Sequence, residues 1–578
     1  MLLHMRKLLV VLALSCVVFA QEKLDESVNA RIRQEAKEHS QAMQTLHMLT
    51  DRYGPRLTGS PNHEAAAKWV VKQMTAWGFQ NAHLEPWDFG HPGWMNERAV
   101  AYMTAPVHEN LKFEVLSWTP STKGLVAGSA VQLELPRGPE IQVSADAQAA
   151  GGGRGGRGGR GPQYEQPTKA QMEEWMAANK DKVHGNMVMI GRAAKIPVNF
   201  NPPQLRRSDD QVKQQYDPAN AGGRGGRGGR GNGGRGGTPG TADPDRLTAN
   251  QVRSMVDAWL VESGAAVRIN DAAMDHGLIR AFQNNTYDLS KVVPTVVMRN
   301  EDYGRIDRLL ADGEAVKLEF DIVNHDYPEG KTSYNVVGEI PGSEHPDEVV
   351  MLGGHLDSWH AATGATDNAV GSTMMLEAAR IIQALGLKPK RTIRVALWSG
   401  EEEGLLGSAA YVKAHFGTAE DPKPEFTKLD AYFNIDDGTG RPRGANIFGP
   451  PEAGAILRAA LDPFADLGVG GAMASSGRTS ASTDSGSFVV AGLPGVNMAQ
   501  DPIEYNSFTW HTNLDTYERI VPEDVVSAAT VVAAEVWFLA NRDQMLPRFT
   551  KEEMPAPPAG RGGRGATPAP AAAGRGGQ

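Results

Sequence analysis

Apolar and polar positions follow a regular pattern between residues 348 and 408. The apolar run 349–352 predicts a buried strand that leads to His355, and the run 393–398 predicts a second buried strand that leads to Glu401. Between these strands, apolar side chains recur at helical spacing over 370–382, which predicts an amphipathic helix. Alternating strands and helices are typical of a mostly parallel α/β sheet.

Side chains that can bind metal ions follow the predicted strands at their C-terminal ends, the edge where open α/β sheets bind ligands. They are two imidazoles and three carboxylates: His355, Asp367, Glu402, Asp436 and His511. Asp367 precedes the amphipathic helix, Asp436 follows a third apolar run, and His511 lies in a polar loop. This donor set suits a pair of divalent ions of borderline softness, with zinc as the first candidate.

Each of these residues also has an ordinary structural interpretation. Consecutive glutamates such as Glu401 and Glu402 are common at solvated helix starts, and Asp367 could serve only as a helix N-cap. The order of all five residues along the chain favours the metal site instead. We expect Glu403 to be a surface residue, and we leave His360 out of the site because it lies outside the pattern.

The remaining sequence predicts two structural units. Residues 21–110, mostly helical at first, and residues 326–545 form the first unit, and short β-like runs over 111–325 predict a β-rich insert within it. We interpret the segment 56–60, RLTGS, as a helix-capping turn rather than as part of the site.

Three segments contain much glycine and few apolar side chains, so we expect them to be flexible. They are two Gly/Arg loops and a Pro/Ala/Gly/Arg tail, at 151–161, 222–237 and 546–578. Arg/Gly segments can bind nucleic acid, but aromatic residues do not interleave with these arginines, and the formal net charge is −10. We therefore expect no nucleic-acid partner.

The first 20 residues have a basic start and an apolar run that ends at Phe19 and Ala20, which is typical of a signal peptide cleaved after Ala20. The run is short for a membrane span. We therefore expect export to the periplasm or the medium without stable membrane insertion. The only cysteine, Cys16, offers a lipoprotein alternative, although the three residues before it match such a site only loosely.

Five motifs resemble those of the co-catalytic di-zinc exopeptidases, the family that includes bacterial leucyl aminopeptidases, glutamate carboxypeptidase II and carboxypeptidase Q. They are HLD from His355, TDN around Asp367, EEEGLLGS from Glu401, NIDD around Asp436 and HTNLDT from His511, in the family's order. The resemblance covers about 25–109 and 335–541. It implies a three-layer α/β zinc-exopeptidase fold with a mostly parallel central sheet. The insert resembles the protease-associated domain that many relatives carry.

The resemblance also implies two zinc ions per chain. Asp367 would bridge them, His355 and Asp436 would complete one site, and Glu402 and His511 would complete the other. A water shared by the two ions would be the nucleophile.

Other residues would support this chemistry. The resemblance implies Glu401 as general base and Asp357 as the partner that orients the first imidazole, with Asp515 doing the same for the second. Glutamate carboxypeptidase II has a tyrosine before its last metal-binding histidine, which helps to hold the oxyanion. Here that position is Trp510, so the oxyanion donor is open and Tyr505 is a substitute to consider.

The resulting prediction is a secreted zinc-dependent metalloexopeptidase that hydrolyses short peptides, either as an aminopeptidase or as a carboxypeptidase Q-like dipeptidase. A glutaminyl cyclase-like acyltransferase with one zinc ion is the first alternative, and an inactive receptor-like binding protein is the second. The complete ligand set argues against both. Which end is cut, which side chain is preferred, and whether the chain is a homodimer stay open.

Overall fold

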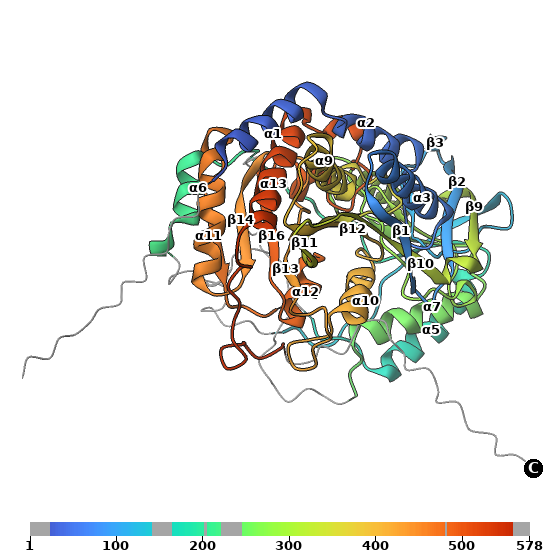
Figure 1. Ribbon diagram of the computed structural model, residues 1–578. Helices are drawn as coiled ribbons and strands as arrows, with labels where there is room; N and C mark the ends of the chain where they lie inside the picture. The colour runs from blue at the N-terminus through green and yellow to red at the C-terminus, as the bar shows by residue number, and fades with distance from the viewer. Residues whose placement is uncertain (1–23, 142–163, 201–204, 221–244, 480–482, 559–578) are drawn as a thin grey trace, which may run out of the picture.

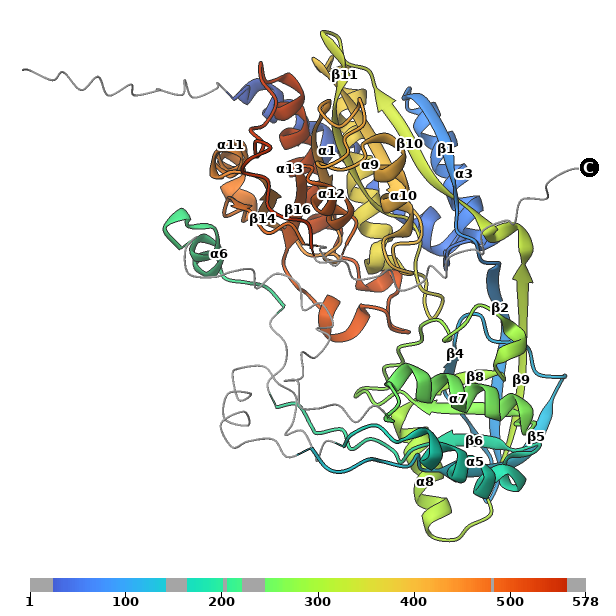
Figure 2. The same cartoon turned by 90° about the horizontal axis from the view of Figure 1, so that it is seen from below.

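Two eight-stranded sheets organise the chain in the computed structural model (Figures 1 and 2). The structure describes residues 24–141, 164–200, 205–220, 245–479 and 483–558. The predicted signal peptide and both predicted Gly/Arg loops lie outside these residues. The first sheet carries the expected metal ligands, and the second is built from the insert.

The first sheet is parallel in its centre, and antiparallel pairs lie on both sides of that centre. Its strands lie in the order β1 (Gln80–Asp88), β10 (Thr332–Ile340), β12 (Arg391–Trp398), β11 (His345–His355), β13 (Leu429–Asn434), β16 (Gly495–Gln500), β14 (Pro442–Phe448) and β15 (Ala472–Ser475). Strands β12, β11, β13 and β16 pair in parallel. Strands β1, β10 and β12 pair antiparallel, as do β14 and β16. The predicted mostly parallel sheet is therefore a mixed one.

Helices cover both faces of this sheet, which makes three layers (Figure 1). One face packs against α1 (Glu26–His39), α2 (Ala42–His47), α3 (Pro61–Ala76), α9 (Val370–Ala384), α11 (Pro451–Leu461) and α13 (Pro522–Asn541). The other face packs against α10 (Leu406–His415) and α12 (Ser485–Ala491). Helix α9 was predicted as amphipathic, but nearly all its side chains are buried because α1, α2 and α13 cover its outer side. None of the described helices is long and apolar enough to cross a membrane.

The second sheet belongs to the insert and lies beside the first unit (Figure 2). Its strands lie in the order β3 (Glu109–Asn110), β2 (Gly93–Ala105), β9 (Lys317–Tyr327), β5 (Val126–Leu133), β6 (Met187–Ile190), β7 (Val267–Asp271), β8 (Thr295–Met298) and β4 (Phe113–Val115). It begins at Gly93, earlier in the chain than the boundary expected at residue 110. Three helices accompany it: α5 (Lys169–Val183), α7 (Ala249–Glu262) and α8 (Asn300–Ala311). The insert, which was predicted to be β-rich, is therefore a mixed α/β unit.

One short helix of the insert packs on the other unit. Helix α6 (Asp209–Tyr216) lies beside β14, away from the second sheet (Figure 2). Tyr216 is 1% exposed, and a Cβ added at Gly444 would lie 2.6 Å from its ring. Arg443 donates to the Asp209 carboxylate at 2.8 Å, and Arg206 donates to Asp524 at 2.8 Å. The insert therefore contacts the first unit far from its own sheet.

The predicted flexible tail starts later than residue 546. Leu546 is buried and donates its N–H to the Asp430 carboxylate at 2.7 Å. Arg548 donates to the Phe426 carbonyl at 2.8 Å, and the ring of Phe549 contacts Phe448. Residues 546–549 therefore belong to the packed structure, and residues 559–578 lie outside the described part.

We expect Tyr216→Ala to release α6 without unfolding the first unit. Tyr216 packs in a small cluster with Val212 and Ala499, separate from the main core, so the loss of apolar contact is local. Limited proteolysis within 205–217 should become about tenfold faster, while the urea midpoint of global unfolding stays nearly unchanged.

Lys213→Ala, an exposed position on the same helix, is the control and should leave both measurements unchanged. A proteolysis rate in Tyr216→Ala equal to that of the wild type would contradict the expected role of this ring.

Candidate metal centre

Three parallel strands end side by side at the centre of the first sheet, and each leads to a predicted metal ligand. His355 is the last residue of β11 and pairs with Trp398 at the end of β12, from which the chain turns to Glu402. Strand β13, on the other side of β11, leads to Asp436. Since parallel strands share one C-terminal edge, the sheet places these side chains together.

Asp367 reaches the same edge from a short irregular helical turn, η5 (Ala365–Ala369), just before α9. It does not cap that helix, because the N-cap position is Ala369 and makes no side-chain cap. Instead, the Asp515 carboxylate accepts hydrogen bonds from Thr366 N at 2.5 Å, Thr366 Oγ1 at 2.8 Å and Asp367 N at 3.2 Å. The prediction that Asp515 orients His511 is therefore wrong: it holds the Asp367 turn.

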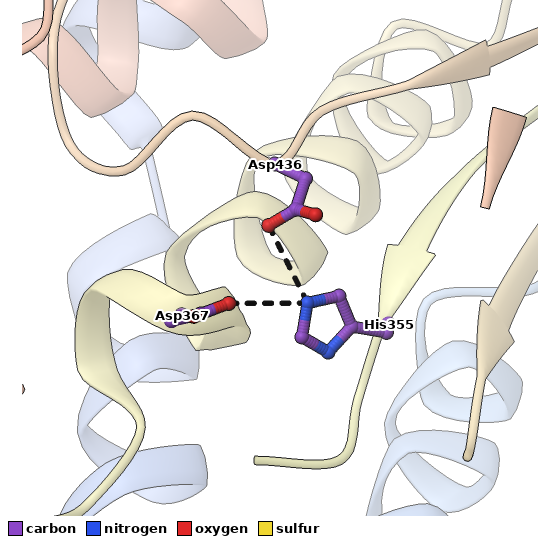
Figure 3. Close-up of side chains that lie close together, drawn as sticks. All are labelled: His355, Asp367 and Asp436. Atoms are coloured by element: carbon purple, nitrogen blue, oxygen red, sulfur yellow. Dashed lines mark ion pairs between the residues drawn. The ribbon is translucent and has the colours of Figure 1, made fainter. Parts of the chain in front are cut away.

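The five predicted ligands form two groups of three that share Asp367. His355 Nε2 lies 3.2 Å from Asp367 Oδ1 and 3.4 Å from Asp436 Oδ1 (Figure 3). His511 Nε2 lies 3.2 Å from Asp367 Oδ2 and 2.9 Å from Glu402 Oε2. Each oxygen of the Asp367 carboxylate therefore faces a different imidazole, as a bridging ligand would.

The electrostatics of this cluster fit bound cations. Burial raises the pKa of Glu402 to about 7, and it also raises that of the neighbouring Asp484 to about 7. His355 Nε2 and both carboxylate oxygens of Glu402 are buried and make no hydrogen bond within the described residues. Two imidazoles and three carboxylates, several of whose buried donor atoms make no hydrogen bond among the described residues, are a donor set that zinc ions would satisfy.

Asp357 supports the site in a different way from the one predicted. His355 Nδ1 lies 3.0 Å from the Asp357 backbone carbonyl, whereas the Asp357 carboxylate is 3.7 Å away. Donation from Nδ1–H to that carbonyl leaves Nε2 free to bind a metal. The Asp357 carboxylate instead accepts from Glu401 N at 3.3 Å, Glu402 N at 3.2 Å and Thr58 Oγ1 at 3.1 Å. It therefore fixes the turn that carries both glutamates.

Glu401 and Glu403 occupy different environments on this turn. Glu401 Oε2 lies 4.0 Å from His355 Nε2, and its side chain is 10% exposed, so it borders the cluster without joining either group. Glu403 was expected at the surface, but it is buried beside Thr58 and Asp357, and burial raises its pKa well above the usual range. Positive φ angles at Gly404 and Leu405 turn the chain before α10 begins.

The insert holds the loop that carries His511. Asn513 N donates to the Ile279 carbonyl at 3.0 Å, and Ile279 N donates to Asn513 Oδ1 at 2.9 Å. The ring of Phe282 meets the His511 imidazole edge to face, with 5.3 Å between centroids. His511 itself has φ of 60°, a left-handed conformation that is costly outside glycine and needs such support. No sequence motif pointed to Ile279, Phe282 or Asn513.

Two further aromatic residues approach the cluster. Trp510 stacks on the His511 ring with 4.0 Å between centroids. The Tyr505 hydroxyl donates to Asp436 Oδ1 at 3.2 Å, so it points into the site. His360 lies outside both groups, as expected, and its Nε2 is 2.6 Å from the Val115 carbonyl.

Comparisons with known proteins agree with this geometry. Residues 335–536 match the model of peptidase family M28. Carboxypeptidase Q of Mus musculus is 33% identical over 256 residues, so the alignment covers 44% of this chain and only about half, 52%, of the relative. Carboxypeptidase Q of Bos taurus is 26% identical over 513 residues, covering 89% of this chain and 88% of the relative.

A solved structure shares the fold. The crystal structure of a peptidase M28 precursor from Shewanella amazonensis superposes with a TM-score of 0.58 at 22% identity, and the match covers 91% of this chain and 98% of the other. The match therefore includes most of the insert as well as the first unit.

We expect Asn513→Ala to loosen the His511 loop. The substitution removes the side-chain acceptor for Ile279 N, one of the two hydrogen bonds that tie this loop to the insert. Hydrogen exchange of the amides in 509–516 should become about tenfold faster.

Asn186→Ala is the matched control, because the Asn186 side chain also accepts from a backbone N–H of the insert, that of Ser129 at 3.0 Å. It should leave exchange in 509–516 at the wild-type rate. Equal acceleration in both variants would mean that the effect is general destabilisation of the insert.

Proposed function

We propose that this chain, whose residues 335–536 match peptidase family M28, is a co-catalytic zinc exopeptidase that hydrolyses a terminal peptide bond of short peptides. The observation that carries the proposal is the pair of donor groups that share the Asp367 carboxylate. We further propose that these groups hold two zinc ions per chain, one on each imidazole. Bound there, the ions would lower the pKa of water and polarise the peptide carbonyl.

The residues around the cluster have separate roles in this proposal. Glu401 lies beside the His355 group and can take a proton from the attacking water and pass it to the amine that leaves. His355 and His511 present Nε2 to the cluster, and the support on His355 Nδ1 keeps its ring in that orientation. The Asp357 carboxylate accepts hydrogen bonds from the backbone N–H groups of Glu401 and Glu402, and it thereby fixes the turn that carries them.

Tyr505 fills the open role of oxyanion donor in this proposal. Burial and the nearby carboxylates of Asp367, Asp436 and Glu402 keep its pKa well above the usual range, so its hydroxyl retains the proton at neutral pH. A protonated hydroxyl beside Asp436 can donate to the carbonyl oxygen on which negative charge develops. Trp510 stacks on His511 and positions that ring.

The substrate reaches this site beside the insert. A small cavity that touches Asp367, Glu402 and His511 is also lined by Trp359, Ala362 and Thr512. We interpret the insert as a protease-associated domain that restricts access to this cavity. The size restriction favours short peptides, and the predicted signal peptide favours an exported enzyme.

One assay tests the proposed function. The purified mature protein is offered the same dipeptide free, N-blocked and C-amidated, with zinc and after chelation. Cleavage of the free and C-amidated forms alone indicates an aminopeptidase, and cleavage of the free form alone indicates a carboxypeptidase Q-like dipeptidase. Absence of cleavage of every form would overturn the proposal. Elemental analysis then separates a one-zinc cyclase from a metal-free binding protein.

We expect Glu401→Gln to lower kcat/KM by about 10²–10⁴-fold, because the amide cannot accept the proton of the attacking water. Zinc content should equal that of the wild type, since Glu401 belongs to neither donor group. Full activity with normal zinc content would exclude Glu401 as the general base.

We expect Tyr505→Phe to lower kcat by about 10²-fold and to change KM little, because the hydroxyl would act on the developing oxyanion and not on the ground-state carbonyl. Steady-state kinetics on the cleaved dipeptide measure both constants. A change confined to KM would assign Tyr505 to substrate binding instead.

A further inference from the structure

Arg56 is a buried arginine whose side chain, within the described part of the chain, hydrogen-bonds to backbone carbonyl groups alone. It is 0% exposed. Its Nε donates to the Leu356 carbonyl at 2.6 Å, and its Nη1 donates to the carbonyls of Leu49 and Thr363, each at 2.8 Å. Its Nη2 donates to the Gly364 carbonyl at 2.9 Å. One planar group therefore ties three segments of the chain together.

Two of these segments are the ends of a single loop, residues 356–364. The loop starts directly after the ligand His355 and ends three residues before the ligand Asp367. The backbone of Arg56 also grips it, since Arg56 N donates to Ser358 Oγ at 3.1 Å and Ser358 N donates to the Arg56 carbonyl at 3.2 Å. We call these hydrogen bonds between Arg56 and the loop the clamp. The clamp fixes the distance between the start and the end of the loop.

The packing around the clamp leaves little room for another geometry. A Cβ added at Gly364 would lie 2.2 Å from Ser358 Cβ and 3.0 Å from Arg56 Nη2. Gly364 has φ of 64°, a conformation suited to glycine. These close contacts restrict the path of the loop backbone past the Arg56 guanidinium. The clamp and the loop conformation therefore depend on each other.

The charge of Arg56 also suits this position. Burial lowers its pKa to about 10, and the carboxylates of Asp515, Asp357 and Asp367 act in the opposite direction, so it stays charged at neutral pH. Among the described residues, no carboxylate oxygen comes within 4.0 Å of its guanidinium. A buried cation without a direct ion pair is costly, and the acidic metal cluster beside it offsets that cost.

We propose that Arg56 is a positioning residue for the metal centre: it holds the 356–364 loop so that His355 and Asp367 stay at the separation that one metal ion requires. The inference rests on the proposed two-zinc function, which it extends to a residue that contacts neither ligand side chain. A helix-capping turn, the expectation from the RLTGS segment, describes only Ser60, which accepts from His63 N at 3.2 Å.

The chain offers a control in Arg391, which differs from Arg56 in that it also pairs with the Glu348 carboxylate at 2.6 Å. This arginine is 2% exposed and also binds backbone carbonyls, those of Arg542 at 2.5 Å and Leu539 at 3.4 Å. It lies at the first residue of β12, whereas the metal centre follows the last. Eight residues of strand separate the two ends by roughly 25 Å. Its loss should destabilise the fold without a specific effect on metal binding.

The test compares Arg56→Lys, Arg391→Lys and the wild type as full-length mature proteins. Lysine keeps the charge but has one point donor group instead of a planar fork, so it cannot hold both loop ends. Zinc affinity is measured by competition with a chromogenic chelator, and thermal unfolding is recorded on the zinc-free proteins. We expect the zinc dissociation constant of Arg56→Lys to rise about tenfold or more. Arg391→Lys should keep the wild-type constant even where it unfolds at a lower temperature.

Two results would overturn the proposal: wild-type zinc affinity in Arg56→Lys, or an equal loss of affinity in Arg391→Lys. If Arg56→Lys does not fold, Ser358→Ala removes the acceptor for Arg56 N, together with a hydrogen bond from the hydroxyl to the Trp359 carbonyl, and it should raise the dissociation constant about threefold. An unchanged constant in that variant would then decide against the clamp. Wild-type protein that binds no zinc and cleaves no dipeptide would instead refute the proposed function itself.

Discussion

Negative charge buried at one edge of the first sheet is the constraint on which the rest of the structure depends. Three parallel strands and one helical turn bring Asp367, Glu402 and Asp436 within hydrogen-bonding distance of two imidazoles. Carboxylates gathered in this way repel one another, and burial raises the pKa of Glu402 to about 7. Cations bound between the donor atoms would stabilise the ionised cluster, so the packing that gathers these carboxylates also prepares the site for metal.

The supporting residues all act on the backbone around this cluster. The Asp357 carboxylate holds the Glu401–Glu402 turn, and the Asp515 carboxylate holds the turn of Asp367. Arg56 joins the two ends of the loop between them. The ligands are therefore placed by buried polar groups that satisfy backbone N–H and C=O groups, in addition to the sheet itself. Such a shell limits how far the ligands can separate before metal binds.

The insert contributes contacts to the metal centre in addition to lying beside the first unit. It holds the His511 loop through Ile279 and Phe282, and its helix α6 packs on the far side of the first unit. Because one metal ligand depends on contacts from the second unit, movement between the units would alter the donor group of His511. The proposed metal site therefore depends on the contact between the two units.

The sequence by itself determined the fold class of the first unit and all five donor residues. Local apolar runs specify strands, and although His355, Glu402 and Asp436 each have an ordinary local interpretation, the order of all five candidates along the chain pointed to one shared site. Only the tertiary structure decided the rest. Arg56, Glu403 and Asn513 have ordinary local sequence contexts, and their burial and partners come from segments distant in the chain. Periodicity describes which residues share a face of one element. Hydrogen bonds between loops depend instead on how the elements pack. For that reason, the residues that support the metal centre could be identified only from the tertiary structure.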